Sequence, residues 1–232
     1  MPAIPRIIHQ TWKSHDIPHD IYPEHWIESW KTFHPHWEHR LWTDADAEEL
    51  VRKTYPQFYD FYVALEPPIK KADFARFLFL HSHGGVYVDL DMVCLQPVAP
   101  LLAEHELVFG RLSPDNDYYQ VPNAFMASTR YHDFWMRIAY DAMRAPPGEQ
   151  AVETLAGPFR LEWALARHRP RCHVHGDGII YPFDWIHLRP WRERAPRADV
   201  VALATKLRMA TVDEMARALP GAYCVTFWAH NW

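Results

Sequence analysis

The sequence is poor in cysteine and glycine and has no long apolar run. Its three cysteines, Cys94, Cys172 and Cys224, lie far apart and form no CxxC pair. This pattern argues against a zinc site or a disulfide framework and fits a reducing compartment.

No stretch approaches the ~20 apolar residues of a membrane-spanning helix, and the first residues lack the basic and apolar segments of a secretory signal. We therefore expect a soluble, cytoplasmic protein without a membrane span.

An excess of positive charge is also missing. The chain carries 24 Lys and Arg against 29 Asp and Glu, which gives a net charge of −5. This balance creates no basic field that would hold nucleic acid, so we expect no nucleic-acid partner.

Tryptophan, by contrast, is abundant, with 11 residues in a chain of 232. Such a surplus either fills the core or marks a pocket that stacks on flat or sugar rings.

Helix and strand signals alternate along the chain. Helical spacing of apolar residues predicts helices over 24–33, 43–55, 70–82, 133–143 and 159–167, and a capping box, Thr211 to Glu214, opens another. Strands are predicted at 7–8, 86–93, 107–110, 123–127, 178–181 and 222–228. This alternation favours a single α/β domain with a mostly parallel central sheet.

The segment Gly84-Gly-Val-Tyr-Val-Asp-Leu-Asp91 is the most informative part of the sequence. Side chains two residues apart in a strand lie on one face, so Asp89 and Asp91 are expected ~6.6 Å apart. Two carboxylates at the end of a buried strand repel each other unless a cation lies between them. Mg²⁺ or Mn²⁺ would satisfy both, because these ions bind carboxylate and phosphate oxygens together. The alternative is a strand that ends in two solvated acids.

The helix predicted before this strand carries Asp73 and Arg76, which are i, i+3 neighbours on one helix face. If that face points toward the acidic strand end, Arg76 would contact phosphate through its forked guanidinium. Asp73 would then accept hydrogen bonds from sugar or ribose hydroxyls. The alternative is an ordinary surface ion pair.

Several segments, taken in order, resemble one known family. The chain opens with Ile4-Pro-Arg-Ile-Ile-His-Gln-Thr-Trp12, and Ala72-Asp-Phe-Ala-Arg76 precedes the acidic segment. These segments resemble the opening strand and central signature of glycosyltransferase family 32, whose members carry an Asp-x-Asp sugar-binding region. That family includes yeast-type initiating α-1,6-mannosyltransferases, and the glucosylating domains of large clostridial toxins share its core. The resemblance continues through Trp42-Thr-Asp44, Asn123-Ala-Phe-Met-Ala-Ser128, Ala156-Gly-Pro158 and Tyr181-Pro182.

The resemblance implies a GT-A fold, a Rossmann-like α/β domain that binds a nucleotide sugar and a divalent metal, Mn²⁺ or Mg²⁺. By position, it implies a catalytic set of Arg76, Asp89 and Asp91. The implied donor and nucleotide contacts are His9, Trp12, which would stack on the base, Asp44, Asp73, Arg76, Asp89, Asn231 and Trp232. Asn123 and Gly157 would contact the donor sugar or the acceptor, and Asp91 would bind the metal. For Trp12, the alternative is a core position.

The end of the chain departs from the family pattern. Members often close with His-His-Trp-x-x-Ser-Trp, whereas this chain reads Thr226-Phe-Trp-Ala-His230-Asn-Trp232. His230 stands where the toxin relatives place a metal-binding serine, so we hypothesise that it replaces that ligand. An imidazole suits Mn²⁺ better than Mg²⁺. The alternative is a frayed terminus.

The implied activity is retaining, metal-dependent transfer of a hexose from a nucleotide sugar to a hydroxyl of a saccharide, glycolipid or protein. A UDP-sugar is favoured over GDP-mannose as the donor. One alternative is a catalytically weak nucleotide-sugar-binding module, which the altered C-terminal motif leaves open. A phosphatase of the haloacid dehalogenase type fits less well, because its Asp-x-Asp lies on the first strand and precedes Gly-Thr, whereas Met92-Val93 follow here.

The resemblance also suggests how the work is divided along the chain. Residues 1–110 would form mainly the nucleotide-sugar and metal half, and residues 111–232 mainly the acceptor half with the closing motif. Phe183, Trp185 and Trp191 could line an acceptor cleft, although core packing explains each of them alone. Peripheral contact with the inner membrane face, or delivery as an effector, are alternatives to a purely cytoplasmic location.

Overall fold

A six-stranded sheet forms the centre of the protein, in the order β2-β1-β3-β6-β5-β7. The computed structural model describes residues 3–229. Three of the five strand pairings are parallel, and β6 runs antiparallel between β3 and β5. The strands of this sheet are β1 (Ile7–Thr11), β2 (Glu38–Trp42), β3 (Gly85–Val88), β5 (Leu107–Gly110), β6 (Phe125–Ser128) and β7 (His173–His175).

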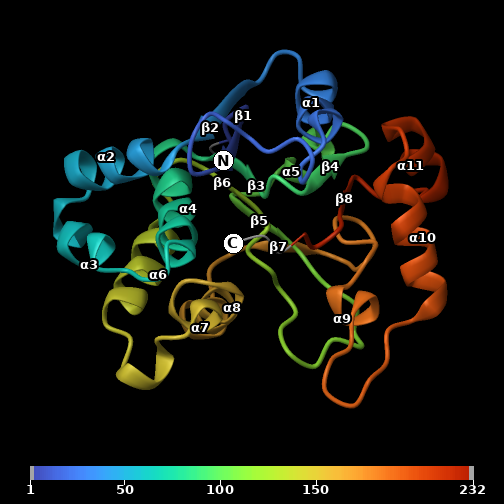
Figure 1. The fold of residues 1–232 in the computed structure, drawn as a ribbon. Helices are drawn as coiled ribbons and strands as arrows, with labels where there is room; N and C mark the ends of the chain where they lie inside the picture. The colour runs from blue at the N-terminus through green and yellow to red at the C-terminus, as the bar shows by residue number, and fades with distance from the viewer. Residues whose placement is uncertain (1–2, 230–232) are drawn as a thin grey trace.

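The sheet is buried on both faces, which is why its central strands are apolar throughout. Alternate residues of β3 and β6 supply different cores: Tyr87 and Met126 face one cluster, whereas Val86 and Phe125 face the other. The first cluster lies under the helices on the left of Figure 1. These are α2 (Asp44–Thr54), α3 (Tyr59–Val63), α4 (Ile69–His83), α6 (Asp133–Met143), α7 (Val152–Leu155) and α8 (Pro158–His168), with short 3₁₀ turns at Pro56–Phe58 and Pro147–Glu149.

The opposite face is covered by a second, two-stranded sheet and the remaining helices. Strand β4 (Met92–Cys94) pairs antiparallel with β8 (Cys224–Thr226), so the last strand lies against a segment in the first half of the chain. Trp30 of α1 donates its indole N–H to the Met92 carbonyl at 2.8 Å, which fixes α1 over β4. The helices on this side are α1 (Glu24–Phe33), α5 (Ala99–Leu102), α9 (Trp185–Leu188), α10 (Ala198–Arg208) and α11 (Val212–Ala218) (Figure 1).

Two adjacent glycines connect α4 directly to β3. Gly84 has φ +65°, and a Cβ there would lie 2.7 Å from the backbone nitrogen of Arg130. Gly85 has φ +94°, and its Cβ would lie 2.6 Å from the Ile7 carbonyl oxygen. Both positions therefore need glycine, because an L side chain is strained at this φ and has no room. The predicted end of the helix at the glycine pair is confirmed.

The sequence predictions hold best where local periodicity is strong. Helices α1 and α6 and strand β5 have the predicted bounds, and both helix caps at Thr43 and Thr211 form capping boxes. The strand predicted over 86–93 is wrong as one element, because a turn at Asp89–Asp91 divides it into β3 and β4. Residues 178–181 form a turn rather than a strand, and β2, β7 and α10 were not predicted. No helix among residues 3–229 is long and apolar enough to cross a membrane.

Candidate active site

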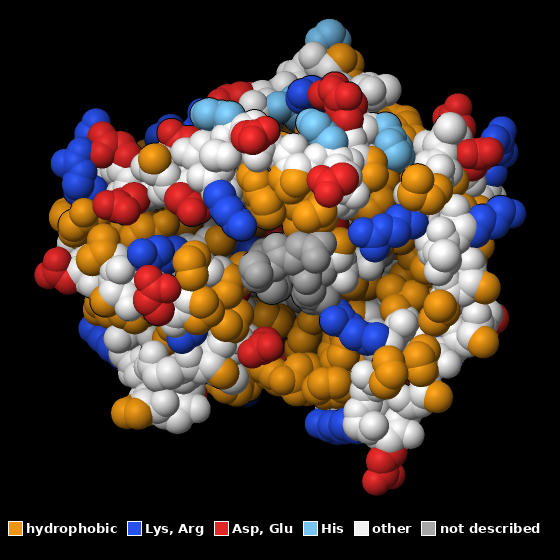
Figure 2. All heavy atoms as spheres, viewed as in Figure 1, with side chains coloured by type: hydrophobic (Ala, Val, Ile, Leu, Met, Phe, Trp, Pro, Cys, Tyr) orange, Lys and Arg blue, Asp and Glu red, His pale blue; other side chains and the backbone are white. Residues whose placement is uncertain are grey.

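A cavity of about 450 Å³ lies at the carboxyl ends of β1 and β3, where ligands bind in α/β sheets. Figure 2 shows a hollow lined by hydrophobic side chains on this face, between the α7–α8 side and the α9 side. The described residues that line the cavity are Thr11, Trp12, Tyr22, Ile69, Asp73, Arg76, Tyr87, Asp89, Leu90, Asp91, Tyr118, Tyr119, Pro122, Asn123, Ala124, Val152, Glu153, Pro158, Trp185, Arg189, Trp191, Trp228 and Ala229.

Arg76 is the centre of a buried ionic network in this cavity. Its side chain is 2% exposed, and its Nη2 lies 2.9 Å from Asp73 Oδ1 and its Nη1 3.2 Å from Asp89 Oδ1. Nη1 also donates to the Asn123 carbonyl at 3.0 Å, and the guanidinium lies 4.6 Å from the ring centre of Tyr87. The i, i+3 spacing on α4 therefore does bring Asp73 and Arg76 to the acidic strand end. Arg76 holds the two aspartates in place, and only its Nε lacks an acceptor among the described residues.

In Asp73 and in Asp89, the same oxygen, Oδ1, contacts Arg76 and accepts a second hydrogen bond. Asn123 Nδ2 donates to Asp73 Oδ1 at 3.0 Å, and the Tyr87 hydroxyl donates to Asp89 Oδ1 at 2.8 Å. Within residues 3–229, Oδ2 of either aspartate forms no hydrogen bond, so each can accept one from a ligand hydroxyl. Burial raises the pKa of Asp73 to about 7, against the opposing effect of Arg76. A ligand donor at Asp73 would therefore also favour its charged form.

Asp91 follows Asp89 through a turn rather than a strand. The Met92 N–H donates to the Asp89 carbonyl at 3.1 Å, and this turn, not the expected two-residue strand period, brings both carboxylates to the cavity. Asp91 Oδ2 accepts the N–H of Ala229 at 2.8 Å, so the segment after β8 closes over it. Burial, and then the charge of Asp89, raise the pKa of Asp91 to about 7. A buried carboxylate next to another carboxylate is stabilised by a cation.

The donor set suits a hard divalent cation. Asp89 and Asp91 supply carboxylate oxygens, which Mg²⁺ and Mn²⁺ prefer, and no Lys or Arg among the described residues pairs with Asp91. Residues 3–229 contain no cluster of three or more His, Cys, Asp or Glu that could hold a metal ion. The phosphates of a bound ligand would supply further oxygen ligands. His230, the hypothesised metal ligand, and Asn231 and Trp232 lie outside the described residues.

Trp12 forms part of the cavity wall and is not a core residue. It is half-buried, its ring meets Tyr22 edge-to-face with centroids 5.2 Å apart, and its Nε1 donates to the Asp16 carbonyl at 3.2 Å. The Lys13 ammonium lies 5.1 Å from the centre of the Trp12 ring. The structure thus places the Trp12 ring at the cavity, where the resemblance expects an aromatic side chain beside the nucleotide base, and a lysine next to that ring.

Three residues expected at the site do not line the cavity. His9 is fully buried: its Nδ1 accepts the indole N–H of Trp42 at 3.0 Å, and its Nε2 donates to the Gly84 carbonyl at 2.7 Å. Asp44 is exposed at the first residue of α2. Gly157 precedes α8, where a Cβ would lie 2.7 Å from the Glu153 Cα, so it permits close packing of α7 on α8. His9 and Gly157 therefore serve packing within the fold, and Asp44 lies at the surface.

The opposite wall of the cavity combines two tryptophans that the sequence suggested as acceptor-cleft residues with two tyrosines that it did not. Trp185 and Trp191 line the cavity, and Trp185 is at the same time buried in a core cluster, as core packing predicts. Phe183 belongs to the core under α10 and α11. Tyr118 and Tyr119 join them from the loop after β5. No local pattern marked these tyrosines, because their position depends on contacts with α9.

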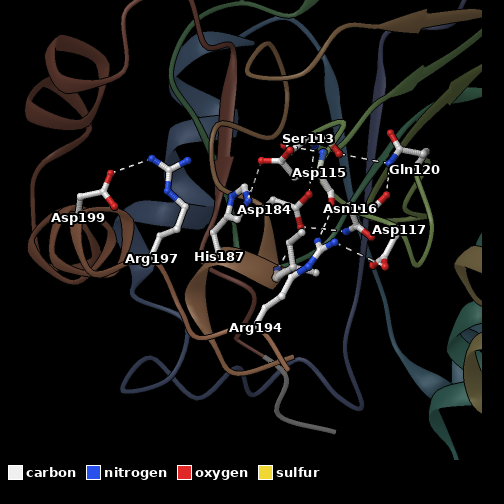
Figure 3. A network of polar contacts seen from close by, with 11 residues as sticks. Ser113, Asp115, Asn116, Asp117, Gln120, Asp184, His187, Arg194, Arg197 and Asp199 are labelled. Atoms are coloured by element: carbon white, nitrogen blue, oxygen red, sulfur yellow. Dashed lines mark hydrogen bonds and ion pairs between the residues drawn. The ribbon is translucent and has the colours of Figure 1, made fainter. Parts of the chain in front are cut away.

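A polar network holds this loop against α9 (Figure 3). Asp184, which is 3% exposed, caps α9 by accepting the Ile186 N–H at 3.1 Å. Its carboxylate also accepts the Ser113 N–H at 3.1 Å and the Asn116 side-chain N–H at 3.0 Å. Asn116 Oδ1 in turn accepts the N–H of Tyr118 at 2.9 Å. One buried carboxylate therefore sets the positions of two parts of the cavity wall.

Comparison with known proteins agrees with the predicted family. Residues 23–108 match the family described as a glycosyltransferase sugar-binding region containing a DXD motif. One curated relative is inositol phosphoceramide mannosyltransferase 3 of Schizosaccharomyces pombe, which is 34% identical over 145 residues. Another is mannosyl phosphorylinositol ceramide synthase SUR1 of Saccharomyces cerevisiae, 39% identical over 137 residues. These alignments cover 61% and 58% of this chain but 38% and 33% of the relatives, so the chain matches well under half of their length.

Solved structures confirm the predicted GT-A type α/β fold. The PaToxG glycosyltransferase has a TM-score of 0.58 at 18% sequence identity, with 95% of this chain and 81% of that chain covered. A glycosyltransferase involved in the glycosylation of the major capsid of PBCV-1 has a TM-score of 0.56 at 10% identity, with 99% and 95% covered. At these identities the likeness concerns the fold alone.

Proposed function

We propose that this chain, whose residues 23–108 carry a glycosyltransferase sugar-binding region, is a metal-dependent glycosyltransferase that moves a hexose from a nucleotide sugar to an acceptor hydroxyl. The observation that carries the proposal is the acidic end of the cavity. There, Asp73, Arg76 and Asp89 form one buried network, and Asp91 lies next to Asp89. Such a site suits the hydroxyl groups and the cation of a nucleotide sugar.

The chain's own residues would bind and orient the donor. Asp73 and Asp89, fixed by Arg76, would accept hydrogen bonds from ribose or sugar hydroxyls. Trp12 would stack on the base, a contact worth ~1–3 kcal/mol. Asp91 would hold the Mn²⁺ or Mg²⁺ ion together with Asp89. When bound, that ion stabilises the negative charge that develops on the departing diphosphate.

We also propose that transfer retains the anomeric configuration. In this route Asp73 and Asp89, which are both paired with Arg76, bind hydroxyl groups and do not attack the anomeric carbon. The acceptor oxygen would form a bond to the anomeric carbon while the bond from that carbon to the diphosphate oxygen breaks. The acceptor proton would pass to the departing diphosphate on the same face of the sugar. A product of inverted configuration, or a glycosyl group trapped covalently on a carboxylate, would contradict this route.

The relatives favour mannose as the transferred sugar. Both are named for mannosyl transfer to an inositol phosphoceramide or its equivalent. We therefore place GDP-mannose ahead of the UDP-sugar that the sequence favoured, and an inositol phospholipid ahead of a saccharide or protein as the acceptor. The binding-module alternative predicts donor binding without turnover.

A thermal-shift screen of GDP-mannose and UDP-sugars, with and without Mn²⁺, tests donor binding. A ligand that binds only the folded state raises stability by RT ln(1 + [L]/Kd), so the cognate donor with Mn²⁺ should raise the melting temperature. Asp91→Asn should abolish the Mn²⁺-dependent part of this shift and lower kcat/KM by about 100-fold or more. Asp60→Asn, an exposed acid on α3, is the matched control and should behave as wild type. A wild-type kcat/KM for Asp91→Asn would refute the metal role.

A further inference from the structure

The wall of the cavity opposite the aspartates is aromatic. Tyr118, Trp185 and Trp191 pack on one another, with ring centroids 5.8 Å apart for Tyr118 and Trp185, 4.5 Å for Tyr118 and Trp191, and 4.8 Å for Trp185 and Trp191. Tyr119 joins them at 5.9 Å from Trp185. We call these four residues the aromatic wall. The indole nitrogens of Trp185 and Trp191 have no hydrogen-bond acceptor among the described residues, although both atoms are buried.

Arg189 lies in the same wall. It lines the cavity, is half-buried, and its guanidinium lies 5.5 Å from the ring centre of Trp185. Within residues 3–229 its guanidinium forms no ion pair and no hydrogen bond. Burial lowers its pKa, and the neighbouring Tyr119 opposes that effect. None of the ion pairs among the described residues joins Arg189 to Asp73, Asp89 or Asp91.

The other arginines of this segment behave differently. Arg192 and Arg194 both pair with Asp117, at 3.0 and 3.7 Å, and Arg197 pairs with Asp199 at 2.9 Å. Figure 3 shows Arg197 and Asp199 pointing toward each other, apart from the network around Asp184. Each of these arginines is exposed and pairs with a carboxylate. Arg189 alone of the four turns into the cavity and lacks one, among the residues that the structure describes.

The charges of the cavity show what Arg189 would bind. Of the described lining residues, the positive ones are Arg76 and Arg189, and Arg76 is already engaged by two aspartates. A partly desolvated guanidinium is stabilised by an anion, and its planar fork fits a phosphate through two parallel hydrogen bonds. Aromatic faces beside it suit the apolar C–H face of a sugar or cyclitol ring.

We propose that the aromatic wall and Arg189 form the acceptor subsite, for an acceptor with a polyol ring next to a phosphate. The ring packs on Trp185 and Trp191, and Arg189 binds the phosphate. The reacting hydroxyl then faces the aspartate side, where the donor lies. This assignment rests on the proposed function, because it places an acceptor opposite the donor in one cavity.

Binding measurements on the nucleotide-loaded protein test the assignment without turnover. Inositol 1-phosphate and inositol, which differ only by the phosphate, are titrated against GDP- and Mn²⁺-loaded protein, which holds no sugar to transfer, with tryptophan fluorescence as the signal. Wild type should bind inositol 1-phosphate about 10- to 100-fold more tightly than inositol, as expected for a charge-assisted hydrogen-bonded contact. Arg189→Gln should remove this preference, and Arg197→Gln, an exposed and paired arginine nearby, should keep it.

Each outcome separates the subsite from the donor site. An equal affinity of wild type for both compounds would overturn the assignment. A weaker GDP-mannose thermal shift in Arg189→Gln would also overturn it, because Arg189 would then belong to the donor. A wild type that binds no nucleotide sugar would instead overturn the proposed function. Inositol phosphoceramide in detergent micelles distinguishes a lipid headgroup from a soluble phosphate. If wild type binds this lipid more tightly than inositol 1-phosphate, and Arg189→Gln loses that difference, the subsite takes a lipid-borne phosphate. If Arg189→Gln keeps the same preference for the lipid, the result counts against the subsite.

Discussion

His9 shows how burial determines the role of a single side chain. Both ring nitrogens are used within the protein, since Nδ1 accepts from Trp42 and Nε2 donates to Gly84. Burial lowers the pKa of His9 to about 3, from an ordinary value of 6.5. The native state therefore binds fewer protons than the unfolded state between these pH values. His9 contributes stability above pH 6.5 that is lost as the pH falls.

This residue predicts a pH dependence of stability. Between pH 7 and pH 5, the advantage of wild type over His9→Gln in the free energy of unfolding should shrink by about 2 kcal/mol, because the unfolded histidine gains a proton and the native one does not. Urea unfolding at several pH values measures this difference. GDP-mannose affinity should stay unchanged, because His9 does not line the cavity.

His36→Gln is the matched control for the loss of an imidazole at the surface, since His36 is exposed. It should leave the free energy of unfolding near that of wild type at each pH. A pH-independent gap between wild type and His9→Gln would contradict the buried, neutral state of His9. A large loss of GDP-mannose affinity in His9→Gln would instead show that His9 contributes to donor binding.

At the scale of elements, short segments position the site more than long helices do. The turn between β3 and β4 directs Asp89 and Asp91 into the cavity, and the four-residue helix α9 places Trp185 there. A four-residue helix does not form alone in water, so α9 depends on its cap. Asp184 provides that cap and binds the loop that carries Tyr118.

Asp184→Asn should therefore affect the acceptor side selectively. The amide replaces one accepting oxygen with a donor, which leaves buried N–H groups without an acceptor and costs about 1–3 kcal/mol of stability. Because the aromatic wall loosens, KM for the acceptor should rise several-fold while KM for the donor stays the same. Steady-state kinetics with each substrate varied in turn measures the two values.

Asp199→Asn is the control, since Asp199 is exposed and pairs only with Arg197 among the described residues. It should change neither KM. Equal increases in both KM values for Asp184→Asn would show general loosening of the fold, and would contradict a selective effect of Asp184 on the aromatic wall.

At the scale of the whole molecule, the two halves of the sequence share one core. A single hydrophobic cluster contains Ile8 and Val86 from the first half together with Tyr181 and Trp185 from the second. Strand β8 also pairs with β4 across the same division. Neither half can leave the other without exposing this apolar surface to water.

We therefore expect the chain to unfold in one cooperative step. Urea unfolding followed by tryptophan fluorescence and by far-ultraviolet circular dichroism should give coincident transitions. Fluorescence reports tryptophans in both halves, such as Trp30 and Trp185, whereas circular dichroism is dominated by the helices. Two separated transitions would contradict the prediction of a single domain.

The sequence by itself determined the local parts of the aspartate side of the cavity. Helical periodicity put Asp73 and Arg76 on one face of α4, and the glycine pair ended that helix just before the acidic segment. Such features depend on neighbours a few residues away, which the sequence displays directly.

Only the tertiary structure decided which side chains face the cavity. The contact from Ala229 to Asp91 spans 138 positions, and the contact from Asp184 to Ser113 spans 71. No local period encodes such pairings. For the same reason, His9 and Trp12 lie in different surroundings although they are three residues apart. His9 is buried against the Gly84 carbonyl, whereas Trp12 lines the cavity. The tryptophan surplus is divided in the same way, because packing across the sheet, not composition, determines which rings are core and which are wall.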